Sequence, residues 1–366
     1  MKFKVQRETL LKPLQLVSGV VERRQTLPVL SNLLVVAEGG KISFTATDLE
    51  VELVADLALE VEDPGEITLP ARKLLDICRT LPETAELELS VSGDKAQLKS
   101  GRSRFSLATL PASEFPSVEE IGGTRQFSVE QRELKSLIER THFSMAQQDV
   151  RYYLNGLMFE METERLRSVA TDGHRLALCE LELATGDGDT QQVIVPRKGI
   201  QELARLLEDS ESTAEVEVGS NHVRVQLPGL RFTSKLIDGR FPEYQRVIPK
   251  AAENILTAGR DELKQALVRT SILSNEKYRG VRLQLSGDRL RILAHNPEQE
   301  EAEEELGVSY EGDELEIGFN VTYLLDALNA VGAEQVTIAL SDANSSCLIQ
   351  APDGGECKYV VMPMRL

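Results

Sequence analysis

The chain has 366 residues, which is more than one ordinary hydrophobic core can organise and enough for two or three domains. The cores of these domains must be aliphatic, because tryptophan is absent and aromatic residues make up only 5%. No stretch approaches about 18 consecutive apolar residues and the N-terminus lacks a signal-peptide apolar region, so we expect a soluble, cytoplasmic protein without membrane contact. The net charge of −18 argues against nucleic-acid binding unless the positive charges are gathered in one part of the molecule.

Sequence landmarks recur in the same order in each third of the chain, which predicts three tandem copies of one domain. One match would be noise, but four in a fixed order are hard to obtain by chance. We place the copies at residues 1–124, 125–253 and 254–366. The landmarks are Leu11, Leu134 and Leu263, each followed by lysine; Asp48, Asp172 and Asn296 after a strand; Pro70, Pro196 and Asn320 before a helix; and Pro116, Pro242 and Pro363.

Each copy is predicted to contain two helices among several strands. Apolar residues at helical spacing mark the second helix of each copy, as at Leu74, Leu75 and Cys78 in the first. Alternating runs such as residues 42–46 and 223–227 indicate strands, and glycine-rich turns separate them. The expected fold class is therefore α+β, with antiparallel sheets backed by helices. The six helical windows are residues 7–17, 71–81, 131–141, 197–207, 260–270 and 321–331.

Positive charge is concentrated in these six windows. Together they hold 14 Lys and Arg against 8 Asp and Glu, a net charge of +6, which leaves −24 for the rest of the chain. The last window contains no Lys or Arg at all. The pattern indicates a positive helical layer on an acidic scaffold, although basic residues also commonly decorate the outer face of amphipathic helices without further function.

The helical layer allows a geometric test of a ring. If helices about 10 Å wide stand side by side around a hole, six leave a bore of about 9 Å and twelve a bore of about 28 Å. Duplex DNA is about 20 Å across. Only a ring of twelve helices admits it, so a ring built from this chain around DNA must be a dimer.

No catalytic or metal-binding motif is evident. The sequence lacks a phosphate-binding G-x-x-x-x-G-K-[ST] loop, a G-x-S-x-G elbow and an H-E-x-x-H pair, and its four histidines are dispersed. The four cysteines form no C-x-x-C pair, so we expect them to be reduced, buried small residues rather than disulfides or zinc ligands. No cofactor or metal is expected. An enzyme of unknown type and an acidic scaffold that never meets DNA remain as alternatives.

Six segments resemble the bacterial DNA sliding clamps, the family of the beta subunit of DNA polymerase III, and the likeness runs over the whole chain. The resemblance implies a non-catalytic processivity factor in which three tandem clamp domains close, as a dimer, into a six-domain ring around duplex DNA. It also implies as partners a clamp loader, the DNA polymerase III catalytic subunit, other polymerases, and mismatch-repair and ligation proteins. The segments are residues 26–33, 100–105, 148–156, 170–176, 274–280 and 359–366.

The resemblance also implies a hydrophobic pocket between the second and third domains that receives short linear motifs of partners. Asp172 and His174 could otherwise suggest a catalytic pair, and the Val- and Met-rich tail a plain final strand. Asn344 replaces a residue that is often apolar in the family, so a more polar rim is expected. The implied pocket residues are Leu154, Thr171, Gly173, His174, Arg175, Leu176, Pro242, Arg246, Val247, Asn320, Tyr323, Ser346, Val360, Val361, Met362, Pro363, Met364, Arg365 and Leu366.

For DNA, the resemblance implies contacts from Arg24, Gln148, Tyr152 and Tyr153, and the charge count adds basic residues that open two helices. Such contacts should be to phosphate and independent of base sequence, because a ring that slides cannot read bases. The two tyrosines could instead be a core strand pair. The added residues are Arg72, Lys73, Arg197 and Lys198.

A run of glutamates near residue 300 would by itself indicate a solvated face. The resemblance places it at the ring joint, opposite basic residues of the first domain, with Ile272 and Leu273 packing on Phe105. Since exposed ion pairs contribute only about 0–1 kcal/mol each, apolar contacts should supply most of the affinity and the charges the pairing specificity. The joint residues are Lys73, Arg102, Arg104, Phe105, Leu107, Ile272, Leu273, Glu298, Glu300, Glu301, Glu303 and Glu304.

Overall fold

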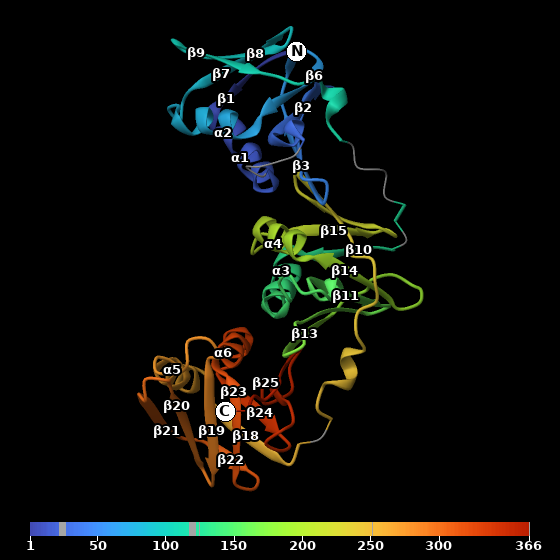
Figure 1. Ribbon diagram of the computed structural model, residues 1–366. Coiled ribbons are helices and arrows are strands. Elements are labelled where there is room, and N and C mark those ends of the chain that lie inside the picture. Colours follow the sequence, from blue (N-terminus) through green and yellow to red (C-terminus); the bar gives the residue numbers. More distant parts are fainter. Residues whose placement is uncertain (22–26, 117–121, 124, 251, 366) are drawn as a thin grey trace. The chain divides into compact units, whose positions relative to one another are not determined.

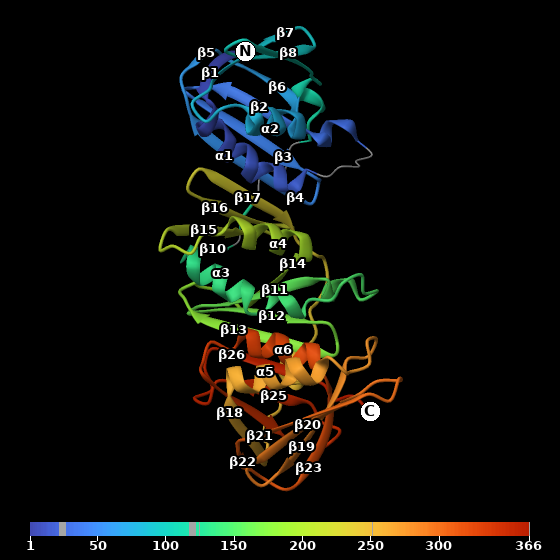
Figure 2. The ribbon, with the colours of Figure 1, turned by 90° about the vertical axis from the view of Figure 1, so that its left-hand side faces the viewer.

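Antiparallel sheets and the helices packed against them make up the chain, as Figures 1 and 2 show. The computed structural model describes residues 1–21, 27–116, 122–123, 125–250 and 252–365. Its contacts divide the chain into unit 1 (Met1–Arg132 with Lys198–Leu236) and unit 2 (Glu133–Arg197 with Ile237–Leu366). The predicted α+β class is confirmed.

The six α-helices of the described residues begin and end within two residues of the predicted windows. Each follows directly on a strand, so the same strand–helix unit occurs twice in every predicted copy. In Figures 1 and 2, α1 lies beside α2, and α5 beside α6. The helices are α1 (Arg7–Val17), α2 (Ala71–Thr80), α3 (Gln131–Glu139), α4 (Arg197–Leu206), α5 (Arg260–Ser271) and α6 (Val321–Ala330).

Short 3-10 turns supplement the helices. They occur where the chain bends between strands, and two of them, η5 and η6, carry residues of the predicted sites. The turns are η1 (Ser18–Val20), η2 (Pro28–Ser31), η3 (Ala112–Glu114), η4 (His142–Ser144), η5 (Tyr152–Leu154) and η6 (Tyr244–Arg246).

Unit 1 contains two sheets, ordered β10-β15-β16-β17-β4-β3-β2-β6 and β5-β1-β7-β8-β9. The pairing of β17 with β4, in which Phe232 lies opposite Leu53, joins strands of the second copy to strands of the first. The strands are β1 (Lys2–Gln6), β2 (Asn32–Glu38), β3 (Lys41–Thr47), β4 (Val51–Ala58), β5 (Val61–Asp63), β6 (Gly65–Pro70), β7 (Glu86–Ser92), β8 (Lys95–Ser100), β9 (Ser103–Ala108), β10 (Arg125–Glu130), β15 (Thr213–Val218), β16 (His222–Leu227) and β17 (Leu230–Lys235).

Unit 2 also contains two sheets, ordered β14-β11-β12-β13-β26-β25-β24-β18-β22 and β21-β20-β19-β23. Here β13 pairs with β26, which joins the second copy to the third. The strands are β11 (Gly156–Glu162), β12 (Arg165–Thr171), β13 (Arg175–Glu182), β14 (Gln191–Pro196), β18 (Asn254–Gly259), β19 (Gly280–Ser286), β20 (Arg289–His295), β21 (Glu301–Gly307), β22 (Ser309–Glu311), β23 (Leu315–Asn320), β24 (Gln335–Leu340), β25 (Cys347–Gln350) and β26 (Cys357–Val361).

The cysteine prediction is wrong for one pair. Cys179 and Cys357 form a disulfide, with their Cα atoms 4.1 Å apart. They lie directly opposite each other in the β13–β26 pairing, although 178 residues separate them in the sequence. Close facing of cross-strand neighbours brings the two sulfurs within bonding range, and sequence spacing gives no sign of it. Cys78 and Cys347 are free and buried, as expected.

The landmark Asp48, Asp172 and Asn296 are turn residues. The side-chain Oδ1 of Asp48 accepts the backbone N–H of Val51 at 2.7 Å, and Asp172 and Asn296 accept backbone N–H groups in the same manner. Such turns favour Asp or Asn because the side chain replaces a main-chain acceptor. Within the described part of the chain, no helix has the length and apolarity needed to cross a membrane. The limits set for the three copies remain a prediction.

Candidate functional site

Segments far apart in the sequence bring the predicted pocket residues together in unit 2. Leu154, Leu176 and Val360 belong to one buried cluster, together with Phe241 and Tyr244. They come from η5, from β13, from β26 and from the connector that follows β17. The connector and the chain end thus meet on the same strands.

The predicted pocket residues divide into a buried floor and an exposed rim. The floor consists of Leu154, Leu176, Val360 and Val361, which are at most 3% exposed. Leu366 lies outside the described residues. The exposed rim residues are Gly173, His174, Pro242, Arg246, Val247, Met362 and Arg365; the half-buried ones are Thr171, Arg175, Asn320, Tyr323, Ser346, Pro363 and Met364.

Arg175 joins β13 to α6 at the centre of this region. Its guanidinium donates to Asp172 at 3.1 Å, to Asp326 at 2.5 Å and to the carbonyl of Phe143 at 2.8 Å. It also lies 4.4 Å from the ring centre of Tyr323, whose pKa is raised by burial. Because these partners hold the guanidinium, Arg175 has a fixed position beside the predicted pocket.

The turn at residues 171–175 is built by local hydrogen bonds rather than for catalysis. The Asp172 carboxylate accepts the backbone N–H groups of His174 and Arg175, so it is already engaged and does not pair with the His174 ring. Gly173 has φ +89, a backbone conformation that residues with a side chain rarely adopt, which explains glycine at this position. His174 then accepts the backbone N–H of Met362, which fastens the chain end to the turn.

The chain end also borders a cleft of about 750 Å³ on the sheet β21-β20-β19-β23. The backbone N–H of Met364 donates to Gly318 of β23 at 2.8 Å. The cleft shares only Met364 and Arg365 with the predicted pocket, and its other walls are mostly polar. These are Asn275, Tyr278, Gly280, Arg282, Gln284, Leu293, Ala294, His295, Glu301, Ala302 and Glu303.

Asn320 and Asn344 serve turns and caps. The Asn320 side chain accepts the backbone N–H of Thr322 at the start of α6 and donates to the carbonyl of Tyr278. Asn344 is exposed, and its backbone N–H donates to Asp342. The polar residue therefore stands on an exposed turn next to Ser345 and Ser346.

The predicted DNA residues differ in how accessible they are. Arg72, Lys73, Gln148 and Tyr152 are exposed, and Tyr152 keeps 58% of its surface, so the alternative of a core strand pair is wrong for it. Tyr152 and Tyr153 lie in η5 with their rings edge to face. Arg24 lies outside the described residues.

Three of the predicted DNA residues are engaged within the chain. Arg72, although exposed, donates to the carbonyl of Val21 at 3.2 Å. Arg197 donates to the carbonyl of Met145 at 3.2 Å. Lys198 forms an ion pair with Asp48, whose side chain is only 4% exposed. Lys198 thus contacts the first copy's turn from the first turn of α4, and its charge is partly compensated there.

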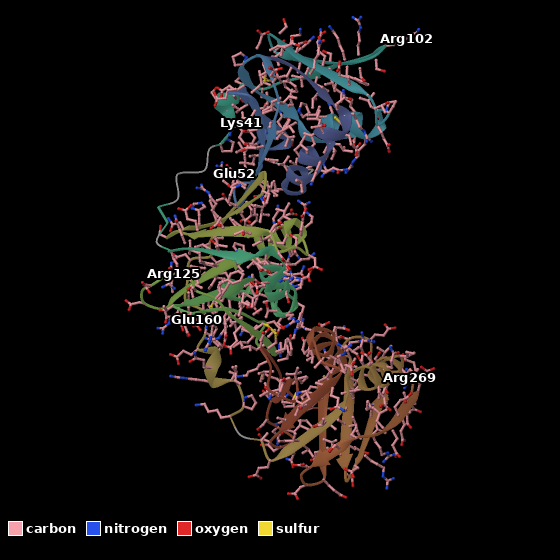
Figure 3. The ribbon with its side chains drawn as sticks, turned by 180° about the vertical axis from the view of Figure 1, so that it is seen from behind. Lys41, Glu52, Arg102, Arg125, Glu160 and Arg269 are labelled. Carbon is pink, nitrogen blue, oxygen red and sulfur yellow. A yellow bond between two sulfur atoms is a disulfide. The ribbon has the colours of Figure 1, made fainter. Side chains whose placement is uncertain are left out.

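The predicted joint residues of the first copy lie on α2, in the β8–β9 turn and on β9. Those of the third copy lie at the end of α5, in the turn after β20 and on β21. Arg104 and Phe105 are on β9, the last strand of its sheet, and Glu301 and Glu303 are on β21, the last strand of another. Ile272, directly after α5, is 73% exposed, whereas Leu107 is buried in its own domain. Figure 3 shows Arg102 at the tip of the β8–β9 hairpin and Arg269 on α5.

Two joint glutamates already have partners in the chain. Arg269 donates to Glu304 at 2.6 and 3.1 Å, and Arg291 donates to Glu303 at 2.5 Å. The pKa of Glu304 is lowered by the hydrogen bond from Arg269. Glu298, Glu300 and Glu301 have no such arginine partner among the described residues.

Sequence reasoning missed the residues that support the pocket from behind. Asp326 holds Arg175 from 151 positions away, and no sequence pattern relates the two. Glu160 and Arg167 carried a weak signal, because each is a charged residue inside a strand that is otherwise mostly buried. Charged residues are rarely fully buried unless they are paired.

Comparison with known proteins agrees with this arrangement. Family models of the DNA polymerase III beta subunit match residues 1–119 (N-terminal domain), 128–243 (central domain) and 245–365 (C-terminal domain). The beta sliding clamp of Pseudomonas aeruginosa is 58% identical over 367 residues, which cover 100% of both chains.

Solved structures agree over the same length. The crystal structure of the DNA polymerase III subunit beta from Pseudomonas aeruginosa matches with a TM-score of 0.98 and 57% identity, covering 100% of both chains. A sliding clamp from that organism, bound to griselimycin, matches with a TM-score of 0.97 and 58% identity, also over 100% of both chains. The chain therefore belongs to the family of the DNA polymerase III beta subunit, the sliding clamps.

Proposed function

We propose that two copies of this chain close head to tail into a six-domain ring, located in the cytoplasm, that encircles duplex DNA. As a member of the sliding-clamp family, the chain is a non-catalytic processivity factor of DNA replication. The ring slides on DNA and tethers partner proteins, which bind the pocket of unit 2 through short linear motifs.

The observation that carries the ring is the pattern of strand pairing. Within the chain, consecutive copies are joined edge to edge, through β4 with β17 and through β13 with β26. The same kind of edge is left at β9 in the first copy and at β21 in the third. Unpaired edges are templates for another chain. Two further pairings of this kind, each between β21 of one chain and β9 of the other, would close the two chains into a ring with cyclic symmetry.

The ion pairs at the internal junctions support the same closure. Lys198 at the start of α4 pairs with the Asp48 turn of the preceding copy. Arg175, beside the Asp172 turn, pairs with Asp326 of α6 in the following copy. At each junction, therefore, a turn is tied to the second helix of the next copy. For the third copy, the turn at Asn296 would face α2 of a partner chain.

That arrangement places opposite charges at the proposed joint. The turn after β20 carries Glu298 and Glu300, and α2 begins with the exposed Arg72 and Lys73. These pairs would set which edges meet, while the exposed Ile272 would bury apolar surface against Phe105 of the other chain. The joint is the place where a clamp loader would open the ring.

Binding to DNA would be topological and independent of base sequence. Exposed groups such as Arg72, Gln148 and Tyr152 can contact phosphate, and contacts to phosphate carry no base sequence. The DNA polymerase III catalytic subunit, other polymerases, and mismatch-repair and ligation proteins are the proposed partners of the pocket. An occupied binding site in a relative supports a ligand-binding role, since the Pseudomonas aeruginosa clamp is described as bound to griselimycin.

Retention on circular DNA tests the proposal. The chain is loaded onto nicked circular duplex and separated from free protein by gel filtration, and the DNA is then cut once. We expect the protein to stay with the circle and to leave after linearisation, because a ring can slide off an end. Equal release from circular and linear DNA would contradict encirclement. The control is the same DNA after cutting, with a bound protein that blocks each of its two ends. This blocked linear DNA should retain the ring.

A further inference from the structure

The connector between β17 and β18 carries three rim residues of the proposed pocket, Pro242, Arg246 and Val247. Among the connector's described residues, regular structure is limited to the short turn η6. The backbone N–H of Tyr244 donates to Pro242 at 2.7 Å and that of Val247 to Tyr244 at 3.1 Å, so these main-chain bonds stay inside the connector. At the start of the connector, the backbone N–H of Ile237 donates to the carbonyl of Ile194 in β14 at 2.8 Å. Around η6 itself, side chains hold the rim against the rest of unit 2.

A polar row crosses four neighbouring strands beneath this connector. Gln192 of β14 lies opposite Glu160 of β11, which lies opposite Arg167 of β12, which lies opposite Glu180 of β13. Directly opposed residues on one sheet face point the same way and can interact. The row thus alternates amide, carboxylate, guanidinium and carboxylate on one face of the sheet.

The Tyr244 hydroxyl completes this row. It donates to Glu160 Oε1 at 2.7 Å and accepts from Arg167 Nη1 at 2.9 Å. Glu160 and Arg167 also form an ion pair. All three residues are nearly buried, with 3%, 8% and 4% exposure for Glu160, Arg167 and Tyr244. Figure 3 labels Glu160 on the sheet near the segment that contains η6.

The outer members of the row fix its charged centre. Gln192 Nε2 donates to Glu160 Oε2 at 2.5 Å, and Arg167 donates to Glu180 through Nε and Nη2, both at 3.1 Å. Burial, and then the bond to Glu160, raise the pKa of Tyr244 to about 12. The tyrosine therefore remains a neutral donor at physiological pH. Bonds to charged, buried partners are stronger and more directional than bonds in water.

We propose that Tyr244 is a positioning residue for peptide recognition, which rests on the pocket function proposed above. Its hydroxyl, held by Glu160 and Arg167, sets the place of η6, and η6 sets the place of Pro242, Arg246 and Val247. Tyr244 does not touch the bound peptide. It acts by holding the rim ready before the peptide arrives, which lowers the cost of ordering the site on binding.

The test compares Tyr244→Phe with the matched variant Tyr310→Phe in the full-length protein. Both remove one buried hydroxyl and keep the ring, and Tyr310 donates to the carbonyl of Asp313 at 2.5 Å, far from the connector in sequence. The probes are labelled griselimycin and a fluorescein-labelled decapeptide with leucine and phenylalanine anchors. We expect Tyr244→Phe to weaken the binding of both probes by about tenfold. Tyr310→Phe should weaken their binding by less than twofold.

A second variant pair distinguishes positioning from a general loss of stability. In the native background, Val247→Ala should weaken binding of the decapeptide by about threefold. In the Tyr244→Phe background it should weaken binding by less than about 1.5-fold, because the rim is already displaced. Gln192→Ala, which leaves the Tyr244 hydroxyl in place, should weaken binding by about twofold. Hydrogen exchange of residues 238–250 should accelerate in Tyr244→Phe and not in Tyr310→Phe.

The outcomes separate this inference from the pocket itself. If the native chain binds neither probe, the pocket fails. If the native chain binds and Tyr244→Phe binds equally well, the pocket stands and the positioning role is overturned. Equal weakening by the two tyrosine variants, or additive effects of Tyr244→Phe and Val247→Ala, would also overturn it, since each outcome points to lost stability without placement of the rim.

Discussion

Replacing Ile272 and Leu273 by alanine should convert the proposed dimer into monomers. Ile272 is 73% exposed at the end of α5 and Leu273 is half-buried, so the chain's own core does not need the full side chains. Alanine suits the helical backbone of Ile272, whose φ and ψ are −59 and −38. The substitution therefore removes apolar joint surface without a reason to unfold the domain.

The size of the effect follows from the exposed surface. Full burial of an isoleucine side chain contributes about 1.5–3 kcal/mol, so the exposed part of Ile272 offers about 1–2 kcal/mol to a partner. The half-buried Leu273 adds roughly 0.5–1 kcal/mol on the same scale. A ring has two joints that must both break, so the dimer loses about 3–6 kcal/mol, which raises its dissociation constant about 10²- to 10⁴-fold.

Sedimentation velocity over a dilution series measures this change. The native chain should remain dimeric at concentrations where the double variant is monomeric. Ile255→Ala is the matched control, because Ile255 is an exposed apolar residue of β18 in the same unit but not of the joint, and the dimer should be unaffected. A double variant that stays dimeric at the same dilution as the native chain would refute the assignment of the joint.

Three further changes test other parts of the structure. Deleting residues 364–366 should abolish binding of the labelled decapeptide, because these residues are predicted to close the pocket, and should leave the dimer intact, because none of them is a predicted joint residue; unchanged peptide affinity in fluorescence anisotropy would count against the pocket. Lys73→Glu should weaken the dimer, and adding Glu300→Lys should restore it in part by reversing the pair; no recovery on sedimentation would speak against that contact. Alkylation under denaturing conditions should modify two cysteines without reductant and four after reduction, and mass spectrometry showing four in both cases would disprove the disulfide of Cys179 and Cys357.

Local patterns predicted the helices because each helix carries its own evidence. The apolar face of α4, with Ile200, Leu203 and Leu206, can be read from a ten-residue window and is buried in the structure. The repeat of strand and helix follows from the same local signals, recurring at similar spacing. The α+β class and the threefold repeat were therefore accessible from the sequence.

Features that depend on strand register could not be predicted from the sequence. Cys179 meets Cys357 only because β13 pairs with β26 in one register, and a shift by one residue would turn the two side chains to opposite faces. The contact of Arg175 with Asp326 and that of Tyr244 with Glu160 likewise join residues 151 and 84 positions apart. The pocket's membership was implied by resemblance, but its supporting contacts required the fold.

Charge counting overstated how much positive charge the helices can offer to DNA. Lys198 is paired with Asp48, and Arg269 with Glu304, so part of the excess serves the chain's own contacts.

The lysines of the repeated Leu-Lys landmark are different. Lys12, Lys135 and Lys264 stand at matching places in the first helix of each copy, and none forms a hydrogen bond or salt bridge with another described residue. None of them is buried. Among the described residues, Lys264 has only a through-space attraction to Asp261. We therefore expect these lysines to meet an external anion, and phosphate is the anion that a ring around DNA would meet.

Changing these three lysines to glutamine tests this reading. The change removes three phosphate contacts from each chain and six from the dimeric ring, so the slope of log affinity for short linear duplex against log salt should fall by about 5.4 if each lysine meets one phosphate. Lys198→Gln should alter the slope by much less, because Asp48 already compensates its charge. An equal change in both variants, or none in the triple variant, would mean that the landmark lysines face solvent rather than DNA.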